Sequence, residues 1–125
     1  MSFVNENVYD YSVNNYSLSI MKKIRFDSYV LETLMPDLTG HDKKPSAFLV
    51  YIYLWSRLAL SRSRTVQASL QTIANETGLS KSAVQASLRH LLRRRLIRSE
   101  QASKTAVPIY SLQRPWRRPA RSADS

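Results

Sequence analysis

The stretch SLQTIANETGLSKSAVQASLRHLL, residues 69–92, decides the fold of this 125-residue chain. Apolar residues recur at helical spacing in its first part, and Ser69 stands where a hydroxyl can cap the start of a helix. Gly78 follows Thr77 where that helix is expected to end, because glycine adopts a left-handed backbone conformation without a Cβ clash. Ser80 is then placed to cap a second helix. The stretch therefore predicts two short helices joined by a tight turn.

The second of these helices has two chemically different faces. Lys81, Gln85 and Arg89 are spaced at i, i+4 and i+8, so they project from one side at a width suited to the major groove of DNA. The apolar residues fall on the opposite stripe and are expected to face the core: Val84, Leu88, Leu91 and Leu92.

The segment after the second helix predicts a β-hairpin. Residues 97–102 lead into a polar tip at residues 103–106, which is followed by the sequence VPIYSLQ. The sequence RTVQ, residues 64–67, is expected to add a short strand to the same sheet. The apolar residues that alternate roughly after the tip are Val107, Ile109 and Leu112.

The sequence TIANETGLSKSAVQASLRHLLRRRLI, with the hairpin after it, is similar to the winged helix-turn-helix domain of bacterial transcriptional regulators of the GntR and MarR types. The resemblance covers residues 46–113 and implies a single domain, mainly α, with a small antiparallel β-wing. It also implies that the second helix touches bases and phosphates while the wing tip touches the DNA backbone or the minor groove. The DNA-binding residues expected from the resemblance and from position are Ser69, Ser80, Lys81, Ser82, Gln85, Arg89, Arg93 and Lys104.

The chain departs from the pattern of these regulators at two places. Regulators of this shape often have a glycine before the first wing strand, where this chain has Arg95. A residue other than glycine there either extends the helix or strains the turn. Ala83 and Gln85 stand where the GntR-like pattern favours threonine and arginine, so the base preference is not transferred.

The charge of the chain is distributed unevenly. The formal net charge is +10, yet residues 1–42 hold three basic and six acidic side chains, whereas residues 43–125 hold sixteen basic and three acidic ones. Six basic residues and no acidic residue lie between positions 81 and 98, as expected for a surface that neutralises phosphates. A basic face that is merely solvated is the alternative, and the turn and the hairpin favour DNA binding over it.

Composition argues against catalysis and against a membrane protein. The chain has no cysteine, which excludes disulfides and thiolate metal sites and fits a cytoplasmic protein. The longest apolar run, AFLVYIYLW, is too short to span a bilayer. His41 and His90 are far apart, with His90 expected at the surface, and the two glycines form no phosphate-binding loop. We therefore expect no enzyme, no catalytic residue, no metal and no cofactor.

The segments outside residues 46–113 are expected to differ in how well ordered their structure is. Residues 1–21 are predicted to be flexible, and residues 22–45 to form an extension packed on the core or at a dimer interface. This extension contains either a helix ending near Pro36 or an extended segment. Residues 114–125 form a basic, disordered tail that either lies along DNA or is a solubilising end, with Trp116 docked onto the wing.

A strong helix is predicted from Pro45 to about Ser61, with Ser46 as a candidate cap. It is apolar nearly all round, although a monomeric winged domain buries only one of its stripes. The other stripe must be covered by residues 22–38 or by a second subunit, and the two solutions can coexist. The candidate dimer interface consists of Phe48, Ile52 and Trp55.

The sequence thus predicts a protein of bacterial or phage type that binds double-stranded DNA sequence-specifically. We expect a transcriptional regulator, a repressor that binds an inverted repeat as a homodimer. One alternative keeps the fold and makes it a replication-initiation or partition protein of a plasmid or phage. Another makes it a winged-helix module for protein assembly. A small-molecule effector is not identifiable from the sequence.

Overall fold

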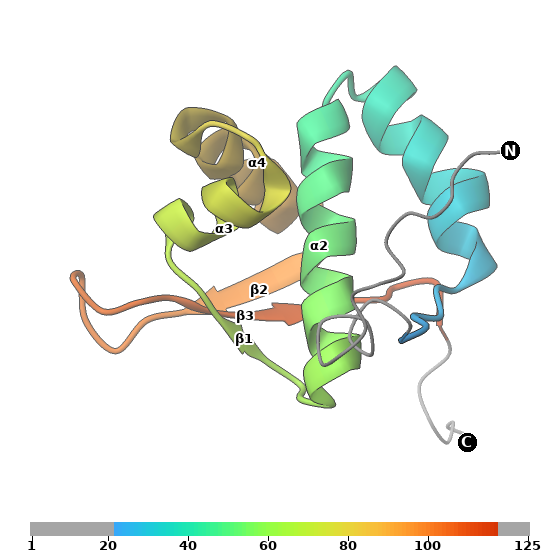
Figure 1. Ribbon diagram of the computed structural model, residues 1–125. Coiled ribbons are helices and arrows are strands. Elements are labelled where there is room, and N and C mark those ends of the chain that lie inside the picture. Colours follow the sequence, from blue (N-terminus) through green and yellow to red (C-terminus); the bar gives the residue numbers. More distant parts are fainter. Residues whose placement is uncertain (1–21, 118–125) are drawn as a thin grey trace, which may run out of the picture.

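Helix α2 (Pro45–Ser61) runs through the middle of the fold in the computed structural model, which describes residues 22–117 (Figure 1). Two further α-helices lie on one side of α2, and helical residues 28–41 lie on the other. A three-stranded antiparallel sheet completes a small, mainly helical domain. The remaining elements are η1 (Val30–Leu34), η2 (Asp37–His41), β1 (Val66–Gln67), α3 (Leu70–Thr77), α4 (Lys81–Arg93), β2 (Ile97–Glu100) and β3 (Ile109–Leu112).

Helix α2 has the extent that the sequence predicts. Pro45 occupies its first turn, where the missing backbone N–H of proline costs no hydrogen bond. No side chain caps this helix, so the expectation that Ser46 is the cap is wrong. At the other end Arg62 adopts a left-handed conformation with φ of 56° and closes the helix. The buried residues of α2 come from several sides of the helix: Ala47, Phe48, Val50, Tyr51, Leu54, Trp55 and Leu58.

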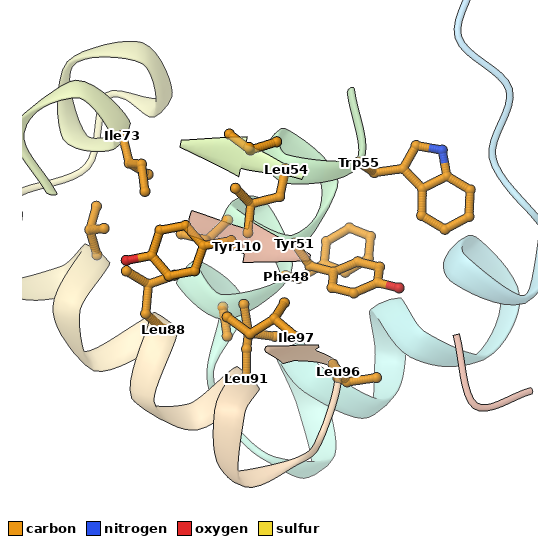
Figure 2. Close-up of a cluster of buried hydrophobic side chains, with 14 of the residues drawn as sticks. Phe48, Tyr51, Leu54, Trp55, Ile73, Leu88, Leu91, Leu96, Ile97 and Tyr110 are labelled. Atoms are coloured by element: carbon orange, nitrogen blue, oxygen red, sulfur yellow. The ribbon is translucent and has the colours of Figure 1, made fainter. Parts of the chain in front are cut away.

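The core forms where α2, α3, α4 and the sheet meet (Figure 2). Tyr51 of α2 and Leu91 of α4 are fully buried, and Tyr110 of β3 lies among them. Leu92, which the sequence also assigns to the buried stripe of α4, is 40% exposed. The stripe through Val84, Leu88 and Leu91 faces the core, and Leu92 is turned about 100° further around the helix than Leu91.

The turn between α3 and α4 has the chemistry predicted from the sequence. The Ser69 hydroxyl oxygen accepts a hydrogen bond from the Thr72 N–H at 3.1 Å, and the Ser80 oxygen accepts one from the Ala83 N–H at 3.1 Å. Gly78 has a φ of 81° and ends α3 in the left-handed region. Both serine caps and the glycine turn are therefore confirmed.

The sheet has the order β1–β3–β2, with both pairs antiparallel. The predicted hairpin is confirmed as β2 and β3, and the short strand expected in residues 64–67 is confirmed as β1. The buried residue of β3 is Tyr110, whereas Val107 precedes the strand and is 42% exposed. The expected alternation is wrong at this point because Val107 belongs to the loop. This loop extends beyond the helices (Figure 1).

The end of α4 shows how the chain places Arg95 at a position where glycine was expected from the resemblance. The helix stops at Arg93, and Arg95 adopts a left-handed conformation with φ of 58°. The Leu96 N–H then donates to the Leu91 carbonyl at 2.9 Å, which is the hydrogen bond of a glycine-type helix ending. Of the two open alternatives, the strained turn is the one observed.

Residues 28–41 are helical throughout, so the expectation of a helix ending near Pro36, or of an extended segment, is wrong. Pro36 lies between η1 and η2, where the hydrogen bonds span five residues, as from the Asp42 N–H to the Asp37 carbonyl at 2.9 Å. The wider turns accommodate a residue that lacks an N–H and whose ring crowds the preceding turn. The buried residues of this segment are Val30, Leu34 and Leu38.

The first residues of the expected disordered tail fold back onto the N-terminal extension. The Trp116 indole N–H donates to Asp27 at 2.8 Å, and Arg117 donates twice to the same carboxylate at 2.7 Å. Trp116 also stacks on Tyr29, with ring centroids 4.5 Å apart. Trp116 therefore docks onto the extension, not onto the hairpin. The predictions for residues 1–21 and 118–125 lie outside the described residues.

Replacing Arg95 by glycine should raise the free energy of unfolding by about 1 kcal/mol, because glycine removes the steric penalty of the left-handed conformation. Chemical denaturation of the two proteins in urea measures the change. The reciprocal variant, Gly78→Ala, should lower the free energy by about 1 kcal/mol, since no atom lies within 4 Å of an added Cβ and only the backbone is strained. An Arg95→Gly protein less stable than the parent would contradict the account.

Candidate nucleic-acid interface

One long face of α4 is open to solvent and carries polar and basic side chains. Its exposed residues include five of the predicted site: Lys81, Ser82, Gln85, Arg89 and Arg93. The opposite face is fixed in the core, so the direction of the exposed face is set by packing. The structure therefore brings these five residues to a single continuous surface.

The two serines of the predicted site lie at the starts of α3 and α4. Ser80 is exposed and its hydroxyl is also 3.3 Å from that of Ser82, while Ser69 is half-buried. Both hydroxyl oxygens accept backbone N–H groups of their own helices. Their first role is thus to begin the helices. Ser80 also places the N-terminus of α4, with its partial positive charge, at the surface.

Lys104 comes from a different element, the loop between β2 and β3. The loop is closed by a hydrogen bond from the Gln101 amide to the Ala106 carbonyl, at 2.8 Å, and Lys104 is exposed at its tip. The loop that carries Lys104 projects beyond the helices (Figure 1). Within residues 22–117, no carboxylate pairs with Lys104 or with the cations of the exposed α4 face.

Helix α4 is anchored near its C-terminal end by a group of charged side chains that the sequence did not reveal. The His90 Nε2 atom lies 2.7 Å from an Asp42 oxygen, and the Arg94 guanidinium contacts the same carboxylate. Arg94 also pairs with Asp37 at 2.8 Å. His90 is only 9% exposed, so its expected surface position is wrong. The Arg94 guanidinium thus faces the two carboxylates.

A sequence signal for this anchor exists in the spacing of its members. His90 and Arg94 are four residues apart on one face of α4. Asp37 and Asp42 are five residues apart, which places them together only in a π-helical turn. Because that turn type was not expected, the two pairs could not be matched from the sequence.

The anchor keeps the Asp42 carboxylate ionised. Burial acts to raise the pKa of Asp42, but hydrogen bonds from His41 and His90 and the charge of Arg94 outweigh it and lower the pKa to about 2. The hydrogen bond to Asp42 in turn raises the pKa of His41 above its usual value. The carboxylate therefore acts as a fixed negative charge that holds two elements together.

Asp37, His41 and Asp42 also satisfy the spacing of a metal site, with one ligand atom from each lying within 4.8 Å of the others. The Arg94 guanidinium already contacts both carboxylates. A metal ion would have to displace this cation, since two positive charges compete for the same oxygens. The anchoring of α4 accounts for the group without a metal.

Two of the three candidate dimer-interface residues are covered within the chain. Phe48 is 6% exposed and Trp55 is 4% exposed, while Ile52 is half-buried. Trp55 stacks on Phe26 with ring centroids 5.4 Å apart and donates its indole N–H to the Arg25 carbonyl at 2.7 Å. Phe48 and Trp55 therefore offer little surface to a second subunit, which corrects the expected interface.

Comparison of the chain with family models, with curated protein sequences and with solved structures found no match. Within residues 22–117, no helix has both the length and the apolar character needed to cross a membrane.

Acidification should weaken the anchor in a defined pH window. The pKa of Asp42 in the folded chain is about 2, below its ordinary value of 3.8, so its stabilisation is present above pH 4 and is lost as the pH falls toward 2. The full loss is about 2 kcal/mol for this carboxyl. Urea denaturation of the parent and of Asp42→Asn, at pH 6 and at pH 2.5, measures the part of this loss that occurs between the two pH values.

The Asp42→Asn variant should be less stable than the parent at pH 6, and the gap should shrink at pH 2.5. Glu32→Gln is the matched control, because Glu32 is exposed and makes no ion pair within residues 22–117. This control should follow the parent at both pH values. An equal gap between the parent and Asp42→Asn at both values would contradict the electrostatic account.

Proposed function

We propose that the chain is a winged helix-turn-helix protein that binds double-stranded DNA sequence-specifically through α4. The observation that carries the proposal is the exposed face of α4, which is polar and basic except for Leu92 near its end, while the other face of the helix is buried in the core. A helix held in this way presents its side chains to the major groove without moving relative to the domain.

Each part of the face has a distinct role in the proposal. Lys81, Gln85 and Arg89 lie on one stripe and reach base edges, because lysine and arginine donate to guanine and glutamine pairs with adenine. Ser80 and Ser82, at the N-terminus of α4, hold a phosphate near the positive end of the helix. The residues assigned to phosphate thus lie at the start of the helix, and those assigned to bases follow along it.

The remaining cations are assigned to the DNA backbone. Arg93 lies near the C-terminal end of the exposed face, and Lys104 lies at the tip of the loop between β2 and β3. With α4 in the major groove and the loop between β2 and β3 beside it, the protein would contact the duplex at two points. The absence of acidic residues between positions 81 and 98 supports this assignment, since nothing in that stretch repels phosphate.

The proposed biological role is that of a cytoplasmic transcriptional repressor that binds an inverted repeat as a homodimer. Two recognition helices one DNA turn apart would multiply the affinity of a single small module. Because Phe48 and Trp55 are covered, the subunit contact in this proposal uses other apolar residues. The exposed large apolar side chains on η1, on the residue after it and on α2 are Leu31, Met35, Leu49 and Leu60.

Charge reversal on α4 tests the DNA surface. The Lys81→Glu/Arg89→Glu variant should lose at least about 100-fold in affinity for the duplex that the parent selects from a random library, because it replaces two attractions to DNA by repulsions. Fluorescence anisotropy at physiological salt measures the affinity, and thermal unfolding checks the fold. Arg57→Glu/Arg62→Glu, a double reversal at exposed positions of α2 and its end, is the control.

The outcome separates the proposed function from its alternatives. Selection of a palindrome supports a dimeric regulator, and selection of iterated direct repeats supports a replication initiator instead. If the parent binds no duplex, or if the α2 control loses as much affinity as the α4 variant, the proposal fails.

Base reading and backbone holding should separate in two single variants. Gln85→Ala should reduce the preference for the selected site over one changed base pair by about 1–3 kcal/mol, because a bidentate contact is lost. Lys104→Ala should weaken binding equally for all sequences and lower the salt-dependence slope by about 1. Titrations at several salt concentrations, on matched and mismatched duplexes, distinguish the two. A Lys104→Ala protein with altered base preference would contradict the assignment.

A further inference from the structure

A groove of about 610 Å³ lies between the C-terminal end of α4, strand β2 and the residues that follow β3. Among residues 22–117, strand β2 pairs only with β3, so it is an edge strand of the described sheet. The volume of the groove falls in the range of small-molecule binding sites, about 300–1,000 Å³. Its lining residues are Leu92, Arg95, Ile97, Arg98, Ser99, Glu100, Gln113, Arg114 and Pro115.

The lining combines apolar groups with three guanidinium groups. Leu92, 40% exposed, and Pro115 contribute apolar surface from two different segments. Arg95, Arg98 and Arg114 contribute the cations, and Glu100 is the single carboxylate in the lining. A groove with this composition suits a ligand that has both an apolar body and a negative charge.

Like Arg89 and Arg93 on α4, the three arginines of the groove form no ion pair among the described residues. Arg94 and Arg117, in contrast, form ion pairs with aspartates. Positive charges that outnumber the negative charges in a concave site create a field that attracts anions. The balance in the groove is three guanidinium groups against one carboxylate.

Arg114 provides a second, independent observation. Its guanidinium lies 4.6 Å from the centre of the Trp55 ring, which fixes its position. Its Nε atom is buried and finds no hydrogen-bond acceptor among the described residues. The Arg114 side chain is thus held in place before any ligand binds, and its buried Nε atom is not accessible to one.

Arg95 provides a third observation from the backbone. It occupies a left-handed position that glycine would fill without strain, and it carries a guanidinium to the rim of the groove. Strained residues of this kind concentrate at sites where the side chain serves a purpose.

We propose that this groove binds a small organic anion, with its carboxylate or phosphate head on the arginines and its apolar body against Leu92 and Pro115. The proposal is independent of DNA binding by α4. The phosphates of a duplex share the chemistry of the head group, but they bring no apolar body that would use the concave wall. A small molecule is therefore the occupant that fits both the basic and the apolar part of the lining.

Phenyl phosphate is a suitable probe, because it joins a dianionic head to a flat apolar body. Amide chemical-shift titration of the full chain should show saturable changes at residues 92–100, 113 and 114. Inorganic phosphate, which has the head alone, should bind at least about 5-fold more weakly. A duplex of the selected sequence is titrated separately to show which residues DNA perturbs.

Variants make the assignment specific. Arg95→Gly/Arg98→Gln should weaken phenyl phosphate binding by at least about 10-fold while keeping the fold, since the first change relieves strain and the second lies on an exposed strand position. Arg62→Gly/Arg57→Gln is the matched control. It removes the same charge and also replaces a left-handed arginine, with φ of 56°, at the end of a helix. The control should bind as the parent does.

Three results would overturn the proposal. The first is that phenyl phosphate causes no saturable change at the groove. The second is that the control variant loses as much affinity as the groove variant, which would mean that net charge alone matters. The third is that the duplex perturbs the groove and displaces phenyl phosphate from it, which would make the groove part of the DNA surface. Loss of DNA binding in the α4 variant leaves both phenyl phosphate readouts unchanged, so the two proposals fail separately.

Discussion

The structure depends on covering a helix that is apolar on nearly every side. Helix α2 buries residues toward α3, α4 and the sheet, and it also buries Phe48 and Trp55 toward the N-terminal extension. Each fully buried side chain of this size contributes about 1.5–3 kcal/mol relative to exposure. Residues 22–41 are therefore not an accessory segment, because without them Trp55 and Phe48 would face water. The extension and the domain form one core around α2.

Polar contacts then fix the extension to the domain at two separate points. At one point Asp42 holds His90 and Arg94 of the α4 end. At the other, Asp27 holds Trp116 and Arg117. The pKa of Asp27 is lowered to about 2, mainly by the hydrogen bond from Arg117, so this carboxylate also remains ionised. Burial of apolar side chains holds the extension against α2, and the contacts of Asp27 and Asp42 fix its orientation on the domain.

Local chemistry explains why much of the fold was predictable from sequence. The caps at Ser69 and Ser80 and the turn at Gly78 depend only on neighbouring residues, and all three were found as expected. The hairpin and the short first strand were also predictable, because alternation and turn residues are local signals. The exposed face of α4 followed from its helical period.

The parts that could not be predicted depend on contacts distant in sequence. The buried position of His90 requires Asp42, 48 residues away, and the position of Trp116 requires Asp27, 89 residues away. The π-helical path through Pro36 has no sequence signature that distinguishes it from a helix end. The groove beside β2 likewise joins three separate segments, and no single one of them suggests a site.

The pairing of Asp27 with residues 116–117 has a consequence for how the chain folds during synthesis. The two partners are 89 and 90 residues apart, so the contact closes one of the longest loops in the domain. Closing a long loop costs entropy before its contacts contribute, so such contacts form late. A nascent chain on the ribosome can assemble α2, α3 and α4 while Tyr29 still lacks its stacking partner. The face of Tyr29 that stacks on Trp116 therefore stays uncovered until residues 114–117 reach the extension, which makes this stacking one of the last contacts of the domain to form.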